Sequence, residues 1–297
     1  MFDSSAYPSD STREGVGMKV ALFGSRGYLG TQLAYDFGHR GVEVVGFDMP
    51  ECDVTDSGFW DDFEPSRYDA ILFFAGKTGT EKSFEEADSF CAVNVMGLLG
   101  LLKRLSHLGE NAPKIIFPSS RLVYKGAEVA LREDSPKEAR TVYAANKLAC
   151  EYLLQAYRIR YGLQYVILRI SVPWGNLIST DYSYGTIGFF MRQANVNKSI
   201  TIYGDGSLRR TLTYIADICE IVFRVTQGVI LSGEYNIGGN IYSLLDIAQK
   251  VSSKQSVSIR FVPWPEAALS IESGSTFFDS SKLDNVVSYG EYVDFDI

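Results

Sequence analysis

The stretch MKVALFGSRGYLG, residues 18–30, decides the fold prediction. Residues 20–23 form a short, continuous apolar run, which is typical of a strand buried on both faces. Gly24, Gly27 and Gly30 follow at intervals of three, and residues 31–38 carry apolar positions that fit a helix. Glycines let the backbone turn tightly and approach a pyrophosphate, which then rests on the helix N-terminus. The stretch therefore predicts a dinucleotide-binding strand, loop and helix.

A second predicted strand, residues 43–48, ends on Asp48, eighteen residues after Gly30. An acid at this point is placed to accept hydrogen bonds from both adenosine ribose hydroxyls, which favours NAD over NADP. Arg26 inside the glycine loop favours NADP instead, because a guanidinium is suited to a 2′-phosphate. The alternative interpretation is that Asp48 has no cofactor contact and only starts a turn before Pro50. We expect NAD, with NADP as the alternative.

Strands and helices alternate through the first two-thirds of the chain. Residues 70–74, 114–117 and 165–168 are further predicted strands, and residues 89–108 and 141–161 are predicted helices. This alternation predicts an α/β fold with a Rossmann-type, doubly wound parallel sheet. We expect an NAD(P)-binding domain over 18–170 and a smaller C-terminal substrate-binding lobe over 171–297, some segments of which return to the sheet. Residues 1–17 are polar and irregular, which predicts a flexible tail.

Composition narrows the class of partner. The chain of 297 residues has 28 Lys and Arg against 36 Asp and Glu, a formal net charge of -8, which argues against a nucleic-acid partner. Neither an apolar run of about 20 residues nor a signal-peptide pattern is evident, so no membrane partner is expected. The four cysteines lack disulfide or metal spacing, and neither histidine lies near a cluster of ligands. We therefore predict a cytoplasmic protein without a metal site.

Tyr143 and Lys147 lie four residues apart in the run TVYAANK, residues 141–147. On a helix these side chains project from one face. A fixed ammonium favours the phenolate, and lowering a tyrosine pKa from about 10 to about 7 needs about 4 kcal/mol, which the lysine and a positively charged cofactor ring would supply together. A tyrosine so tuned exchanges a proton with a sugar or alcohol hydroxyl. The spacing also arises by chance, as a half-buried tyrosine beside a surface lysine.

The order of these motifs carries a resemblance to a known family. The motifs are the glycine loop, Asp48, the run DVTD (53–56), the run FAG (74–76), Asn94, Ser119–Ser120, Val123–Tyr124, Tyr143 and Lys147. Over about residues 18 to 285 the chain resembles the extended short-chain dehydrogenase/reductases, which are nucleotide-sugar epimerases, dehydratases and reductases. The run YGDGSLRRTLTYIAD, residues 203–217, resembles a further block of that family.

The resemblance implies a role for each matching residue. The catalytic residues would be Ser120, Tyr143 and Lys147. The cofactor would be held by Gly24, Arg26, Gly27, Tyr28, Leu29, Gly30, Asp48, Asp53, Val54, Ala75, Gly76, Asn94, Tyr143, Lys147 and Pro173. The nucleotide-sugar substrate would be held by Lys77, Thr78, Ser120, Arg121, Tyr143, Val172, Asn176 and Arg210, with Arg210 on its phosphates. A homodimer would form through the helices of residues 89–108 and 141–161, unless their apolar side chains only cover their own sheet.

Departures from the family pattern narrow the reaction. The dehydratases carry Asp-Glu directly after the catalytic Ser or Thr, where this chain has Arg121 and Leu122, so 4,6-dehydration is not expected. Val172 stands where the family has an asparagine, and Asn176 is displaced from that position. The short stretch between Asp48 and Asp53 is similar to the 4-keto-sugar reductases. We expect hydride transfer at sugar C4 by a 4-keto-6-deoxysugar reductase. The alternatives are an NAD-dependent 4-epimerase and a non-catalytic NAD(P)-sensing scaffold.

Overall fold

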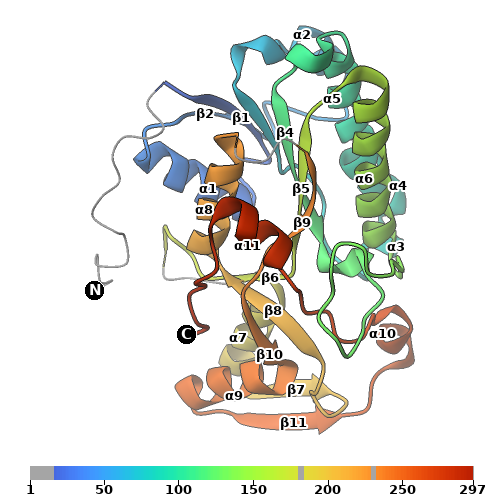
Figure 1. Ribbon diagram of the computed structural model, residues 1–297. Helices are drawn as coiled ribbons and strands as arrows, with labels where there is room; N and C mark the ends of the chain where they lie inside the picture. Colours follow the sequence, from blue (N-terminus) through green and yellow to red (C-terminus); the bar gives the residue numbers. More distant parts are fainter. Residues whose placement is uncertain (1–16, 180–183, 229–231, 297) are drawn as a thin grey trace.

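A six-stranded parallel sheet forms the centre of the larger part of the molecule (Figure 1). The computed structural model describes residues 17–179, 184–228 and 232–296, so the predicted tail lies outside the described residues except for Gly17. The strand order is β2-β1-β3-β4-β5-β9, and every pairing is parallel. The strands are β1 (Lys19–Phe23), β2 (Glu43–Phe47), β3 (Ala70–Phe73), β4 (Lys114–Ser120), β5 (Tyr165–Ile170) and β9 (Gly233–Asn236). The predicted α/β sheet is therefore confirmed.

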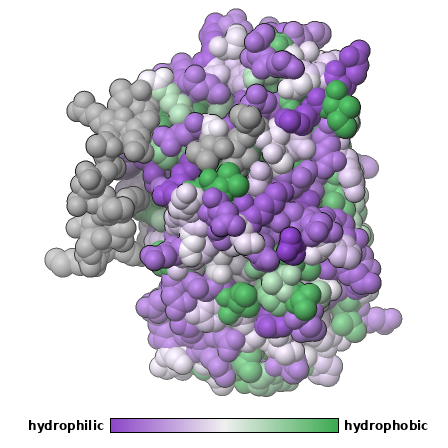
Figure 2. All heavy atoms as spheres, viewed as in Figure 1, coloured by the Kyte–Doolittle hydropathy of each residue, from purple (hydrophilic) through white to green (hydrophobic). Residues whose placement is uncertain are grey.

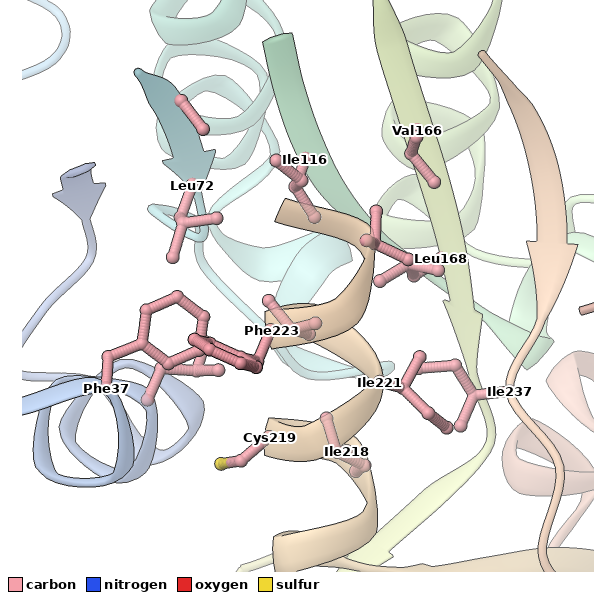
Figure 3. Close-up of a cluster of buried hydrophobic side chains, with 14 of the residues drawn as sticks. Phe37, Leu72, Ile116, Val166, Leu168, Ile218, Cys219, Ile221, Phe223 and Ile237 are labelled. Atoms are coloured by element: carbon pink, nitrogen blue, oxygen red, sulfur yellow. The ribbon is translucent and has the colours of Figure 1, made fainter. Parts of the chain in front are cut away.

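Helices cover both faces of this sheet. One face packs against α1 (Tyr28–His39), α8 (Ile215–Thr226) and α11 (Ser281–Val287). Figure 3 shows Ile221 of α8 beside Ile237, while Phe223 of α8 lies edge-on to Phe37 of α1 at 5.5 Å between ring centres. The elements on the other side are α2 (Ser57–Asp62), α3 (Lys82–Glu85), α4 (Ala87–Cys91), a π-helical turn (Ala92–Met96), α5 (Gly97–Ser106) and α6 (Val142–Tyr161).

A smaller lobe with its own apolar core follows the fifth strand of the sheet. Its strands form a three-stranded sheet in the order β10-β8-β6 and a parallel pair of β11 with β7. The elements are β6 (Val172–Trp174), α7 (Gly185–Asn197), β7 (Ser199–Tyr203), β8 (Arg209–Tyr214), β10 (Asn240–Ser243), α9 (Leu244–Gln255), β11 (Ser258–Val262) and α10 (Glu266–Ile271). The side of the molecule drawn in Figure 2 is mainly hydrophilic, with small, separated apolar groups.

The glycine loop lies at the point where the order of successive strands in the sheet reverses. Strand β1 pairs with β2 on one side and with β3 on the other, so a crevice opens between the ends of β1 and β3. Gly24 directly follows β1 with φ +80°, and a Cβ there would lie 2.6 Å from the Ala75 nitrogen. A Cβ on Gly30 would lie 2.0 Å from the Gly24 carbonyl oxygen. Both positions therefore require glycine for the loop to pack this closely.

Helix α6 is defined at both ends and tied to the sheet by a buried ion pair. The Thr141 side chain caps its N-terminus by accepting from the Ala144 amide, and Gly162 ends it with φ +76°. Arg169 of β5 donates to both carboxylate oxygens of Glu151 on α6, at 3.0 and 2.6 Å. These side chains are 4% and 3% exposed. The pair therefore fixes the helix against the centre of the sheet.

The stretch Ala87–Ser106 meets the length and composition criteria for a membrane-spanning helix, which the sequence prediction did not anticipate. Core helices meet the same criteria. Leu98, Leu101 and Leu105 in this stretch are fully buried against the sheet. Here the apolar character is explained by packing on one side of the helix.

Replacing Glu151 tests the contribution of the buried pair. Glu151→Gln should lower the free energy of unfolding by about 3–5 kcal/mol, because Arg169 would keep a buried charge without its partner. Urea unfolding measures this, and Glu151→Leu with Arg169→Met should recover part of the loss. Glu128→Gln is the control, since Glu128 is 83% exposed and its pair with Arg209 is worth about 1 kcal/mol or less. A loss as small as that of the control would contradict the assigned role.

Candidate active site

A cavity of about 600 Å³ lies at the carboxyl ends of the central strands. Its walls come from the start of α1, from the segments at the ends of β3, β4 and β5, and from α6 and α7. The predicted site residues that line it are Leu29, Gly76, Thr78, Ser120, Arg121, Tyr143, Lys147, Val172 and Pro173. All three predicted catalytic side chains therefore meet in one cavity.

Ser120, Tyr143 and Lys147 are placed by the end of β4 and the buried face of α6. Ser120 is the last residue of β4, and its hydroxyl accepts from the Leu122 amide at 3.2 Å. A side-chain hydrogen bond joins Ser120 to Tyr143. The Lys147 Nζ donates to the Pro118 carbonyl at 2.7 Å and lies 5.9 Å from the centre of the Tyr143 ring. The phenol, hydroxyl and ammonium thus surround one corner of the cavity.

The pKa of Tyr143 in the ligand-free protein is set mainly by burial. Burial raises it above its ordinary value and the neighbouring Tyr184 raises it further, while the Ser120 hydrogen bond and the Arg121 charge lower it. Burial also lowers the pKa of Lys147 to about 8. The sequence prediction combined Lys147 with a positively charged cofactor ring, so a pKa near neutrality in the complex stays a prediction. In the protein alone, desolvation outweighs the opposing effects on the Tyr143 pKa. Without a ligand, Tyr143 is therefore a protonated phenol at neutral pH.

The buried Lys147 predicts a pH-dependent stability. Its folded-state pKa of about 8 lies below the ordinary 10.5, so wild-type stability should rise with pH between these values. Below about pH 8, the free energy of unfolding of the ligand-free Lys147→Met variant should therefore exceed that of wild type by up to about 3 kcal/mol. This difference should shrink towards pH 10.5, as denaturant unfolding at several pH values would show. Lys125→Met, at an exposed lysine, is the control, and a difference that is constant with pH would contradict the burial argument.

The glycine loop is suited to the pyrophosphate of a dinucleotide. No side chain caps α1 at its N-cap Gly27, and the first turn of the helix carries no acid. An uncapped helix N-terminus attracts an anion through its exposed N–H groups and its dipole. Leu29 in this first turn and Gly76 after β3 line the cavity on either side of the crevice. The residues present therefore fit a bound dinucleotide.

Asp48 and Arg26 favour a ribose without a 2′-phosphate. The Asp48 carboxylate accepts from the Arg26 amide at 2.7 Å and the Met49 amide at 2.8 Å, which holds it beside the glycine loop. The Arg26 side chain is turned to Glu51, with 2.6 Å between Nη1 and Oε2. A 2′-phosphate would have to displace Glu51 and lie near Asp48. The contacts therefore fit NAD better than NADP.

Other predicted cofactor residues shape the loops around the crevice. Asn94, inside the π-helical turn, accepts from the Lys77 amide at 2.7 Å and donates to the Lys77 carbonyl at 3.1 Å. The Asp53 carboxylate accepts from the Thr55 amide and hydroxyl, and the buried Val54 carbonyl accepts from the Trp60 indole. Ala75 lies against Gly24. These contacts hold the loops, while direct contact with a cofactor stays a prediction.

Three predicted substrate residues, Lys77, Asn176 and Arg210, do not line the cavity. The Lys77 ammonium binds Glu86 at 2.5 Å and Ser89 at 2.9 Å. The Asn176 side-chain oxygen accepts from Gln32 of α1 and from the Ile178 amide, so it holds its own loop against α1.

Arg210 is 2% exposed and donates to the Glu272 carboxylate at 2.9 Å and the Gly274 carbonyl at 2.7 Å. These partners belong to the C-terminal segment, which the sequence motif did not indicate. In this arrangement Arg210 fastens that segment to β8 instead of facing the cavity.

Tyr184 is a cavity residue that the sequence analysis missed. Its ring stacks on Tyr28 of the glycine loop at 4.4 Å between centres, and its hydroxyl is hydrogen-bonded to Thr78. The Tyr28 hydroxyl donates to the Gly175 carbonyl at 2.7 Å. No spacing in the sequence signals the stack between Tyr28 and Tyr184, which lie more than 150 residues apart. Within the described ranges, no cluster of three His, Cys, Asp or Glu side chains is arranged to hold a metal ion.

Comparison with known proteins agrees with this geometry. The chain is 34% identical to the mouse dTDP-D-glucose 4,6-dehydratase over 64% of its length, a match that spans about half (52%) of that protein. It is 28% identical to the dTDP-L-rhamnose 4-epimerase of Burkholderia thailandensis, over 80% of this chain and 81% of that protein.

The fold is shared with the UDP-glucose 4-epimerase of Thermus thermophilus, solved in complex with NAD. The TM-score is 0.77 at 22% identity, over 90% of this chain and 92% of that one. The profile of the NAD dependent epimerase/dehydratase family matches residues 20–238. The chain therefore belongs to the NAD dependent epimerase/dehydratase family, whose members modify nucleotide sugars.

Proposed function

We propose that this protein is an NAD-dependent nucleotide-sugar epimerase that inverts a sugar carbon by oxidation and reduction. The observation that carries the proposal is the meeting of Ser120, Tyr143 and Lys147 in one cavity whose described walls bear no carboxylate. Bound NAD would take up a hydride from the sugar and return it. The protein's own task is to move the hydroxyl proton and to hold the sugar.

Each catalytic side chain has a separate part in that task. The Tyr143 and Ser120 hydroxyls both reach the same corner, where they bind the reacting sugar oxygen. The ligand-free phenol has to lose its proton before the oxidation step. As a phenolate, Tyr143 accepts the proton of the sugar hydroxyl during oxidation and returns it during reduction, while Ser120 holds the oxygen through the transfer. Lys147, anchored on the Pro118 carbonyl, presents a positive charge that favours the phenolate when the proton leaves.

Dehydration needs a further acid or base to remove a hydroxyl from the neighbouring carbon. The positions directly after Ser120 hold Arg121 and Leu122, which both line the cavity. This favours epimerisation over the dehydratase reaction of the mouse relative, which matches over only about half its length. The 4-epimerase relative matches over most of its length.

Reduction of a 4-keto-6-deoxysugar is the second candidate. The connection from β2 to Asp53 is short, which is the feature that resembles the 4-keto-sugar reductases. The two reactions share the same catalytic side chains and differ in the fate of the cofactor. An epimerase regenerates NAD in each turnover, whereas a reductase consumes one NADH per product.

The function is tested with the purified full-length chain and a panel of UDP-, dTDP-, GDP- and CDP-sugars. We expect inversion of one sugar carbon by NMR, with catalytic NAD and no net NADH consumption. Tyr143→Phe should lower kcat by about 10²–10⁴ while NAD binding changes little, because the proton relay alone is lost. Tyr157→Phe, on the same helix but away from the cavity, is the control. Stoichiometric NADH consumption would indicate the reductase, and an unchanged rate in Tyr143→Phe would contradict the mechanism.

A homodimer is the second part of the proposal. Tyr152 and Ile159 of α6 are 62% and 87% exposed, and their spacing of seven places them on one face of the helix. Met96, in the π-helical turn beside α6, is 54% exposed. Exposed apolar side chains grouped in this way are typical of subunit contacts. Cytoplasmic location and the lack of nucleic-acid or membrane partners stay predictions.

Replacing these side chains tests the dimer. Wild type should sediment as a dimer at micromolar concentration, and Tyr152→Glu with Ile159→Glu should shift it to monomer with its circular dichroism unchanged, because two charges would be buried at the contact. Val129→Glu, at a residue 71% exposed elsewhere, is the control. A monomeric wild type would contradict this interface.

A further inference from the structure

Tyr184 joins the smaller lobe to the wall of the cavity. It is the N-cap residue of α7, a helix of that lobe, and its side chain lines the cavity. Its ring stacks on the Tyr28 ring with 4.4 Å between the ring centres and 14° between the ring planes. Its hydroxyl is hydrogen-bonded to the Thr78 side chain. One side chain next to the smaller lobe thus contacts the larger domain at two separate points.

The two points lie on opposite sides of the dinucleotide crevice. Tyr28 begins α1 directly after the glycine loop that follows β1, and Thr78 lies in the loop after β3. The two strands are neighbours in the sheet, where Phe23 at the end of β1 is paired with Phe73 at the end of β3. In sheets of this kind a dinucleotide binds between the loops that follow such strands. Tyr184 therefore bridges the two sides of the crevice.

The partner ring of Tyr184 is itself fixed. The Tyr28 hydroxyl donates to the Gly175 carbonyl at 2.7 Å, directly after β6. Gly175 has φ +87°, and a Cβ there would lie 2.4 Å from the Tyr214 ring, so this turn requires glycine. The hydroxyl contact orients the Tyr28 ring, and Tyr184 covers the ring in that orientation. The stack is therefore supported from both lobes.

The backbone beside Tyr184 is suited to a local movement. Gly185, the next residue, has φ +62°, and a Cβ there would meet no atom within 4 Å. Glycine is therefore favoured at this position by the backbone conformation and not by crowding. Small residues at the end of an element often absorb the dihedral change of a hinge. A rotation at Gly185 separates the two rings while Ile187 and Phe190 of α7 stay buried in the core of the smaller lobe.

The bridging position also lies beside the catalytic corner. Tyr184 and Tyr143 line the same cavity, and the electrostatic effect of Tyr184 helps to raise the pKa of the Tyr143 phenol. Closing an active site in this way excludes water from the place where hydride and proton are exchanged. A side chain that opens and closes here controls both the crevice and the catalytic corner.

We propose that Tyr184 is a latch that closes the dinucleotide crevice and slows the release of NAD. The proposal rests on the proposed function, because it assigns retention of the cofactor to a residue of the same site. An epimerase returns the hydride to the sugar that it oxidised, so loss of the cofactor between the two steps would end the turnover. A bridge between the two sides of the crevice, supplied from beside the other lobe, meets this requirement.

The test measures the exchange of NAD directly, without turnover. Release of radiolabelled NAD is followed after addition of excess unlabelled NAD, for wild type, Tyr184→Ala, Tyr184→Phe and the control Phe189→Ala. Phe189 lies on the same helix, is 43% exposed and does not line the described walls of the cavity. Tyr184→Ala should release NAD about 10-fold faster or more, because the stack and the hydrogen bond are both lost. Tyr184→Phe keeps the stack, so its release should be only about threefold faster.

Replacing Thr78 tests the bridge from the other side of the crevice. Thr78→Val removes the hydrogen bond to the Tyr184 hydroxyl and should accelerate the release of NAD as much as Tyr184→Phe does. Because the two variants lose the same contact, the double variant should release NAD no faster than either single variant. Additive effects would show that the two side chains act separately and would contradict the bridge.

The rate of NAD association separates a latch from general damage to the site. A latch that is closed in the ligand-free protein also limits entry, so Tyr184→Ala should bind NAD at least as fast as wild type in stopped-flow fluorescence. Slower association, or release no faster than in the Phe189→Ala control, would overturn the proposal. The proposed function would survive that result if wild type still inverts a sugar carbon with catalytic NAD. Failure of wild type to bind NAD would instead defeat the proposed function itself.

Discussion

The bidentate contact between Glu151 and Arg169 holds the catalytic helix in place, and the active-site geometry depends on it. Glu151 lies on the same face of α6 as Lys147 and Tyr143, one and two turns further along. Arg169 also donates to the Tyr124 hydroxyl at 2.7 Å, which in turn donates to Asn236 of β9 at 2.7 Å. One network therefore joins α6, β5, the turn after β4 and the last strand of the sheet. Shifting any of these elements would move the phenol relative to Ser120.

The site is an electrostatic exception within an acidic protein. Lys147 is 6% exposed, and burial weakens its hold on a proton. Tyr143 is held in its neutral form by the same loss of solvent. The buried positive charge of Lys147 lowers the stability of the ligand-free protein, and a negatively charged ligand that enters the cavity would compensate it. The cavity is therefore built for binding and proton transfer at the expense of the stability of the free protein.

The sequence predicted the features that depend on local patterns. The glycine loop, the buried strands and the shared helix face of Tyr143 and Lys147 follow from spacing and periodicity, because neighbouring residues determine them, whereas the role of Ser120 was implied by the family resemblance. The partners of Arg210, Lys77 and Asn176 were not predictable, since Glu272 lies 62 residues from Arg210 and no motif links them. The stack of Tyr184 on Tyr28 was not predictable for the same reason, because no motif links the two residues. The raised pKa of Tyr143 was missed because burial is set by the whole fold, whereas a four-residue spacing reports only the nearby charge.

The π-helical turn at Ala92–Met96 couples two parts of the fold that have different requirements. Helix α4 precedes this turn and α5 follows it, and their buried side chains pack against one face of the sheet. Within the turn, the Asn94 side chain is hydrogen-bonded to both the amide and the carbonyl of Lys77. A residue added to or removed from a helix rotates everything beyond it by about 100°. The wider turn absorbs one residue, so the leucines keep their contacts while the amide faces the loop. Evolutionary insertions or deletions in this helix would thus be tolerated only in compensating pairs, and the cofactor loop and the leucine face would have to change together.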